Sequence, residues 1–395
     1  MRSSLFLVGL AHRVLADISQ CKLAAPPNVD LSLGFTSIFD GAPSTGALNG
    51  YMLFVDFPDY PALSGETPES LRDVFLPDAA DWYETASFGR LTLNMSADTS
   101  RFYRMPATAD SYGWKRGLTF EAHQEYIQDA IEVAGLDNIP ADVDVLYITT
   151  TANAAAISFS VSLVSEVVDR DSKQHVARRA VTFGVDVYKT WHARTLNHET
   201  GHAMGLPDLY PYSGGATGLY VGGWDIMGLI SGASPDYFGW SKWWLGWLDD
   251  AQVACVAAAA AGTPASVTLS PIEVQGGTGH KMVVVTGTNN TQKVLVAEVR
   301  SSNRGVNSGL ATAGCATGVL LYTVDVGVST GNGPIRVLDS TPGSGGCDGD
   351  ELNDAALVLD APGRPSSFAF PEFGVVVSLI GKTDDDIYEL EVAVL

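Results

Sequence analysis

The stretch LNHETGHAMGLPDLY, residues 196–210, carries the strongest structural signal in this chain of 395 residues. It places two histidines four residues apart, a glutamate beside the first, and then a glycine and an aspartate at fixed offsets. From the composition, an accidental HExxH in this chain has odds on the order of one in two hundred, and the downstream GxxD lowers them further. The alternative interpretation is an ordinary helix with a face of satisfied polar residues.

Residues four apart lie on one face of a helix, so His198 and His202 can present two imidazoles to one ion with Glu199 close by. Gly205 can end the helix with a positive φ and turn the chain back. The carboxylate of Asp208 can then reach the same ion. Zinc takes nitrogen and carboxylate ligands tetrahedrally, and a catalytic site leaves one position for water. The pattern therefore predicts a catalytic zinc site with these two histidines and Asp208 as ligands.

A second aspartate, Asp225, also follows the histidine pair and is the alternative third ligand. Asp208 stands six residues after His202, a separation that one glycine-assisted turn can span. Asp225 stands two residues before Met227 and would have to serve a turn and the metal together. We expect Asp225 to hydrogen-bond backbone N–H groups and shape that turn, and we predict Asp208 as the ligand.

The remaining histidines stand alone in the sequence. Each is expected to be a surface or hydrogen-bonded histidine rather than a ligand. They are His12, His123, His175, His192 and His280.

The chain is strongly acidic, with a formal net charge of −22. Such a surface repels nucleic acid and anionic membranes, so neither is an expected partner. No run of about 18 or more apolar residues occurs, so no membrane span is predicted. Part of the acid excess lies at 347–354 and 383–386. We expect solvated loops there, with calcium as the alternative because clustered carboxylates suit a hard cation, although neither run has EF-hand spacing.

Four cysteines are present without a CxxC motif, which disfavours a thiol zinc site or a redox motif. An even number fits two disulfides formed in an oxidising compartment. Cys315 and Cys347 flank strand-like segments and a long Gly-rich loop. We therefore predict that they pair with each other, which leaves Cys21 to pair with Cys255.

Two further features are compatible with secretion. Sequons at Asn94 and Asn289 are candidate glycosylation sites. Residues 1–16, MRSSLFLVGLAHRVLA, combine a positive residue with a short apolar core that His12 and Arg13 interrupt, and form a candidate leader. We expect a secreted, extracellular protein.

Strands and helices alternate in the first part of the chain. Residues 1–47 are interpreted as the candidate leader followed by an extended lead-in rich in Pro, Gly, Ser and Asn. Residues 48–250 form the order typical of an α/β domain. The predicted strands are 49–57, 90–97, 142–150 and 181–189, and the predicted helices are 75–88, 119–135 and 191–205.

After residue 250 the pattern changes to short strand-like runs separated by Gly, Asn and Ser. Residues 251–395 are therefore predicted to form an all-β, sandwich-like domain. The runs are 266–274, 281–287, 293–300, 318–326, 373–381 and 388–395.

The motif HETGHAMGLPDLY (198–210), followed by GGWDIMG (222–228), resembles the immune inhibitor A-like secreted zinc metallopeptidases of the metzincin clan. Metzincins carry an extended zinc motif on a helix and a downstream methionine in a tight turn beneath the metal, a place that Met227 matches. The stretch PDYFGWSKWWLGWLDD (235–250) is similar to the helix that follows this turn. The resemblance implies a metzincin-like α/β catalytic domain with a five-stranded mixed sheet, followed by a β-sandwich.

The resemblance is strong over 190–250, and it extends more weakly to 54–59, 86–93, 294–300 and 319–326. One departure concerns a tyrosine that some metzincins have near the zinc, two residues after the methionine. Leu229 stands there in this chain. Tyr220 and Tyr237 are candidates for that role, although a packing role is favoured for each. Met227 has an alternative as well, because a methionine in a turn can simply fill core space.

The sequence therefore predicts a zinc endopeptidase that acts on protein or peptide substrates. Glu199 takes the proton of a zinc-bound water as it attacks the peptide carbonyl, and then delivers it to the leaving amine. Two alternatives stay open. One is a non-enzymatic protein that keeps zinc for structure and works through its β-sandwich, and the other is a zinc hydrolase of non-peptide bonds. The sequence does not indicate an oligomeric state.

Overall fold

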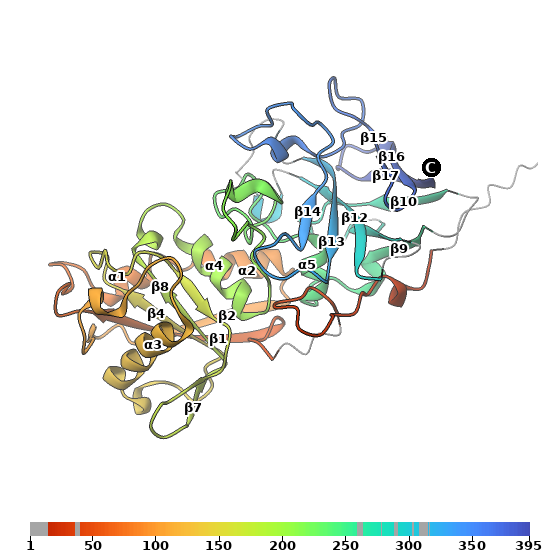
Figure 1. Cartoon of the computed structure of the whole chain (residues 1–395). Coiled ribbons are helices and arrows are strands. Elements are labelled where there is room, and N and C mark those ends of the chain that lie inside the picture. Colours follow the sequence, from red (N-terminus) through yellow and green to blue (C-terminus); the bar gives the residue numbers. More distant parts are fainter. Residues whose placement is uncertain are drawn as a thin grey trace, which may run out of the picture.

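The computed structural model describes residues 15–35, 40–258, 264–277, 279–287, 291–301, 304–307, 315 and 317–395. Figure 1 shows a sheet flanked by helices in one half of the molecule and two further sheets in the other half. His12, Asn289 and residues 1–14 of the candidate leader lie outside the described residues.

The first sheet is mixed, as predicted, but in the described residues it has six strands rather than the five that the resemblance implied. Its strands follow the order β2-β1-β4-β8-β5, with β3 also paired to β1. The first four run parallel, and β5 runs antiparallel to β8. Their bounds are β1 (Gly46–Asp56), β2 (Leu91–Ala97), β3 (Tyr103–Arg104), β4 (Val145–Thr150), β5 (Val161–Leu163) and β8 (Arg179–Phe183).

Both faces of this sheet are covered because successive side chains of a strand point to opposite faces. On β1, Leu53 and Val55 face a core shared with α3, whereas Met52 and Phe54 face a core shared with α2 and α4. The helices are α1 (Pro68–Arg72), α2 (Asp78–Ala86), α3 (Phe120–Ala134), α4 (His192–Ala203) and α5 (Gly239–Trp244). None of the helices in the described ranges is long and apolar enough to cross a membrane.

Two sequence predictions were wrong in extent. The strand predicted over 181–189 ends at Phe183, and Val185–Tyr188 forms a short 3-10 helix instead. A segment distant in sequence packs at this point, because the backbone of Phe159 approaches Gly184 so closely that a Cβ on Gly184 would lie 2.5 Å from the Phe159 nitrogen. The helix suggested over 235–250 is shorter in the structure, where α5 covers only Gly239–Trp244. Gly246, just beyond its end, has φ of 80°, which is not a helical value.

The C-terminal region is sandwich-like, as predicted. One sheet has the order β10-β17-β16-β15 and the other β14-β13-β12-β11-β9, and inward side chains of both share one apolar core. The sequence analysis did not predict β9, β14 and β15. The alanine-rich run at β9 and the very short β14 and β15 show no clear alternation of apolar and polar residues. The bounds are β9 (Val253–Ala257), β10 (Ala265–Leu269), β11 (Met282–Thr286), β12 (Lys293–Arg300), β13 (Gly318–Asp325), β14 (Ile335–Val337), β15 (Ser367–Phe370), β16 (Val375–Lys382) and β17 (Tyr388–Val394). A separate pair, β6 (Val167–Val168) and β7 (His175–Ala177), was also missed.

The outer face of the five-stranded sheet packs on the first half of the chain. Tyr322 of β13 lies against Phe238, with ring centroids 4.5 Å apart. Its hydroxyl accepts a hydrogen bond from the backbone N–H of Trp240 in α5 at 3.2 Å. The two halves therefore share a continuous core.

Both predicted disulfides are present. Cys21 pairs with Cys255 across 234 residues of sequence, and Cys315 pairs with Cys347 across 32. The first bond ties the N-terminal lead-in to β9, and the second closes a loop within the C-terminal region. No free cysteine remains among the described residues.

The two disulfides should differ in their effect on stability. In the chain-entropy model, removing a cross-link that closes the longer loop costs about 5 kcal/mol, against about 4 kcal/mol for the shorter loop. We expect Cys21→Ala/Cys255→Ala to lower the urea midpoint of unfolding at least as much as Cys315→Ala/Cys347→Ala. Non-reducing peptide mapping of the wild-type protein checks the pairing, and free thiols at these positions would contradict it.

Candidate metal centre

Helix α4 and the segment after it bring three predicted ligands to one point. The Nε2 atoms of His198 and His202 lie 3.3 and 3.2 Å from the same oxygen, Oδ1 of Asp208. The three ligand atoms lie within 4.8 Å of one another, and all three residues are buried. In the described part of the chain, no other group of His, Cys, Asp and Glu residues meets this condition.

Backbone carbonyls orient both imidazoles. Nδ1 of His198 lies 2.9 Å from the carbonyl oxygen of Ile226, and Nδ1 of His202 lies 2.7 Å from that of Leu206. A carbonyl can only accept, so each Nδ1 carries the hydrogen, and in the neutral ring Nε2 keeps its lone pair. Histidines that ligate metals are oriented in this way by a hydrogen bond at their other ring nitrogen.

The chain turns back after α4 because of a glycine. Gly205 has φ of 105°, which residues with a Cβ rarely adopt. The N–H of Leu206 donates to the carbonyl of Gly201 at 2.9 Å and closes the helix end. This turn carries Asp208 to the two histidines, as the motif predicted.

The charge balance at this point suits a cation. Burial opposes ionisation of Asp208, but the two histidines hold the pKa of its carboxyl far below its usual range. Burial also opposes protonation of His202, but the Asp208 carboxylate outweighs it and raises the pKa of that imidazole to about 9. The negative charge that retains a proton here would equally attract a metal ion, and metal binding would displace protons.

Oδ1 of Asp208 is buried and has no hydrogen-bond partner. A buried acceptor left unpaired is costly, and this one faces two imidazole nitrogens. Two imidazole nitrogens and one carboxylate oxygen are a typical donor set for catalytic zinc, with one position left for water. The residues present therefore fit zinc.

Glu199 lies beside this cluster and lines the same cleft, whose volume is about 680 Å³. Its side chain is buried, and burial raises the pKa of its carboxyl. The rest of the lining comes from the lead-in, the loop before α3, strand β5, the segment after α4 and the loop between β13 and β14; it includes Asp30, Arg116, Val161, Ser162, Tyr210, Tyr212 and Thr330. A buried carboxylate at the floor of a cleft is placed to exchange a proton with a molecule bound there.

Asp225, the alternative ligand, has another task. It is fully buried, and its two carboxylate oxygens accept hydrogen bonds from the backbone N–H groups of Met227 and Phe238, both at 2.7 Å. Burial raises the pKa of Asp225 to about 7, although both amides favour the charged form. Asp225 therefore shapes the turn around Met227. The sulfur of Met227 packs against α4, where a Cβ added at Gly201 would lie 2.6 Å from it.

Neither tyrosine considered for a place near the ion lines the cleft. Tyr237 is buried behind α4, where its hydroxyl donates to the carbonyl of Asn197 at 3.0 Å. Tyr220 lies under the guanidinium of Arg336, with the ring centroid 4.1 Å away. Both are packing residues. Leu229 belongs to the turn, and its N–H donates to the carbonyl of Asp225.

Sequence reasoning missed three residues at the site. Tyr210 stacks on His198, with ring centroids 6.4 Å apart, and the hydroxyl of Tyr212 donates to Asp208. Tyr210 ends the motif and Tyr212 stands two residues after it, so their spacing from Asp208 was a usable signal. Thr330 has no such signal, because it comes from the C-terminal region and reaches the site only through the fold.

The other histidines have separate roles in the structure. His123 is buried next to Thr182, and burial lowers its pKa to about 4. His175 contacts Glu166, and His192 donates to a backbone carbonyl.

The acidic runs at 347–354 and 383–386 form no three-ligand cluster among the described residues. Calcium binding therefore stays a prediction.

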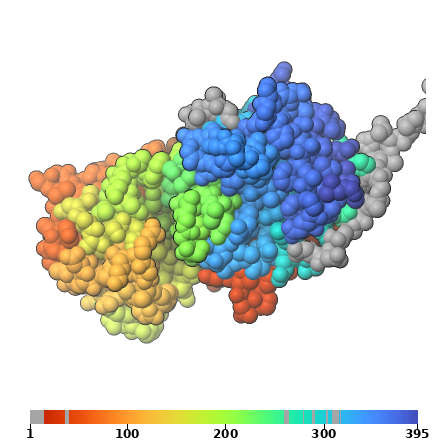
Figure 2. Space-filling view, turned by 45° about the horizontal axis from the view of Figure 1, so that its top comes forward, coloured from red at the N-terminus to blue at the C-terminus, as the bar shows by residue number. Residues whose placement is uncertain are grey.

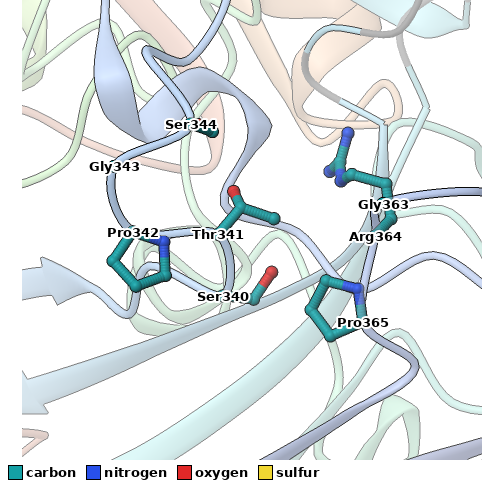
Figure 3. Close-up of a pocket in the computed structure, with 8 residues that line it drawn as sticks. All are labelled: Ser340, Thr341, Pro342, Gly343, Ser344, Gly363, Arg364 and Pro365. Atoms are coloured by element: carbon teal, nitrogen blue, oxygen red, sulfur yellow. The ribbon is translucent and has the colours of Figure 1, made fainter.

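A second hollow lies in the C-terminal region (Figure 3). Arg364 is the only ionisable side chain among the residues that line it, and its guanidinium donates to the carbonyl of Ala356 at 2.8 Å. The hollow therefore offers no acid–base pair.

No family model matches the chain, and no curated protein matches it. Among solved structures, the chain is similar to a crystal structure of catalytically inactive OgpA from Akkermansia muciniphila in complex with an O-glycopeptide (glycodrosocin) substrate. The identity is 12%, the match covers 75% of this chain and 92% of that chain, and the TM-score is 0.25. A likeness of this size carries no weight for fold or function beside the geometry of the site.

The assignment of the third ligand can be tested with two aspartate variants. We expect Asp208→Ala to lose stoichiometric zinc, because it removes a ligand. Asp225→Asn should keep zinc but unfold more easily, by about 1–3 kcal/mol, because its amide group faces a backbone N–H that needs an acceptor. Metal analysis and urea unfolding of both purified proteins check this. If only Asp225→Asn lost zinc, Asp225 would be the ligand and Asp208 would not.

Proposed function

We propose that this chain is a secreted zinc-dependent endopeptidase of the immune inhibitor A-like, metzincin type. The observation that carries the proposal is the buried cluster of His198, His202 and Asp208 with Glu199 beside it, opening into a cleft. On this proposal residues 48–250 form the catalytic domain, and residues 251–395 form a β-sandwich domain that supports it.

The side chains have separate tasks in the proposed reaction. His198, His202 and Asp208 would hold zinc, which lowers the pKa of water and polarises a carbonyl when bound. The Glu199 carboxylate accepts the proton of the attacking water and then protonates the leaving amine. Its raised pKa brings it closer to neutrality, where a carboxyl can serve first as a base and then as an acid.

The proposed peptide substrate has a surface to pair with. Strand β5 is an edge strand of the mixed sheet in the described part of the chain, and its residues Val161 and Ser162 line the cleft. An edge strand presents unpaired backbone N–H and C=O groups to an extended peptide. Pairing there would bring a peptide carbonyl toward Glu199.

A non-enzymatic zinc protein is the main alternative. Structural zinc sites are usually closed by four protein ligands and are often rich in cysteine. Here three ligands meet at the floor of a cleft, and the cysteines lie in disulfides elsewhere. This arrangement favours catalysis. The two disulfides also support the proposed secretion, because disulfides persist in oxidising compartments.

The base can be tested by Glu199→Gln. We expect a fall in peptide cleavage of roughly 10²–10⁴-fold, because the general base is lost, with zinc stoichiometry and unfolding midpoint close to those of the wild-type protein. Casein or a quenched peptide library serves as substrate. Near-normal turnover in the variant would rule out this mechanism.

Metal removal provides a separate test of the function itself. Cleavage of casein by the wild-type protein should stop with 1,10-phenanthroline and return when zinc is added to the dialysed protein. A panel of ester and amide substrates in the same assay separates a peptidase from a hydrolase of non-peptide bonds. A protein that binds zinc and cleaves none of these substrates would favour the non-enzymatic alternative.

A further inference from the structure

The two oxygens of the Asp208 carboxylate have different surroundings. Oδ1 faces both imidazoles and forms no hydrogen bond. Oδ2 accepts a hydrogen bond of 2.5 Å from the hydroxyl of Tyr212. Tyr212 thus engages Oδ2, and Oδ1 is the oxygen that lies near both imidazole nitrogens.

The segment that holds Asp208 and Tyr212 is fastened to the loop at 326–334, which connects β13 to β14 and is called the β13–β14 loop below. The N–H of Asp208 donates to the hydroxyl of Thr330 at 2.9 Å, and its carbonyl accepts from the N–H of Gly331 at 3.0 Å. The N–H of Tyr212 donates to the carbonyl of Gly331 at 2.9 Å. Three hydrogen bonds, two of them between backbone groups, therefore join the two segments. Figure 2 shows blue C-terminal surface packed beside the green segment that follows α4.

The close approach of Tyr212 to this loop requires glycine at position 331. A Cβ there would lie 2.2 Å from the ring of Tyr212, and Gly331 has φ of 71°. The loop itself is braced from within, since Asn332 donates to the hydroxyl of Ser329 and to the carbonyl of Thr330, both at 3.1 Å. The β13–β14 loop is therefore shaped to receive the tyrosine.

We propose that Tyr212 is a positioning residue for the metal ligand Asp208, and that the β13–β14 loop of the C-terminal region completes the metal site. The inference rests on the proposed zinc site. Tyr212 holds Oδ2, so Asp208 binds the ion through one oxygen only, and the loop fixes the backbone on which both residues stand. The C-terminal region then helps to position a metal ligand, in addition to packing against the first half of the chain.

Tyr212→Phe removes the hydroxyl and keeps the ring. Hydrogen-bonding partners of metal ligands typically contribute about 10–100-fold to metal affinity, so the zinc dissociation constant of this variant should rise by about that factor. Tyr220→Phe is the matched control, because Tyr220 packs against Gly333 of the same loop without lining the cleft. Its zinc affinity should equal that of the wild-type protein. Competition with a chromogenic chelator measures all three values.

A spectroscopic readout separates positioning from general destabilisation. In the Co²⁺-substituted Tyr212→Phe protein, the released Oδ2 can also bind the ion, so the visible bands should weaken as the coordination number rises. A merely structural role would leave these bands unchanged. Gly331→Ala, which displaces the ring and keeps the hydroxyl, should change the bands and the zinc affinity in the same direction.

The outcomes distinguish this inference from the proposed function. Stoichiometric zinc in the wild-type protein, with weaker binding and altered Co²⁺ bands in Tyr212→Phe, supports both. Wild-type affinity and unchanged bands in Tyr212→Phe overturn the inference and leave the zinc site intact. A wild-type protein that binds no zinc overturns both.

Discussion

Helix α4 buries three ionisable side chains, and the segments packed around it are arranged to supply their partners. Helix α4 carries His198, Glu199 and His202 into the interior, where a charged or polar group without a partner is costly. The partner of His198 is the backbone carbonyl of Ile226, and the partner of His202 is that of Leu206. The chain after α4 must therefore turn back on the helix, and the turn around Met227 must lie beneath it.

Two buried ionisable side chains, Asp225 and Arg300, hold the turn around Met227. Asp225 accepts two backbone N–H groups of the turn and of the approach to α5. From the other side, the guanidinium of Arg300 on β12 donates to the carbonyl of Trp224 and to the hydroxyl of Ser234, both at 2.7 Å. Arg300 is itself paired with Glu298 at 2.9 Å. A buried guanidinium needs such partners, so the five-stranded sheet and the turn stabilise each other's position.

Much of the fold followed from patterns in the sequence because those patterns are local. The apolar spacing of α3 and the continuous apolar run of β4 predicted both elements within a few residues. The errors lie where a distant backbone intervenes. Phe159 ends β8 next to Gly184, and β9 is a strand only because it pairs with β11, which its alanine-rich sequence does not reveal.

The motif alone predicts that His198 and His202 share one helical face with Glu199 next to it, and that Asp208 follows a glycine turn. Helix geometry and φ preferences act over a few residues, so a motif contains them in full. The groups that surround the motif come from distant parts of the chain. Asp208 meets Thr330 across 122 residues of sequence, and Arg300 meets Trp224 across 76. Contacts of this kind depend on how two sheets and several loops pack together, and no local spacing records them.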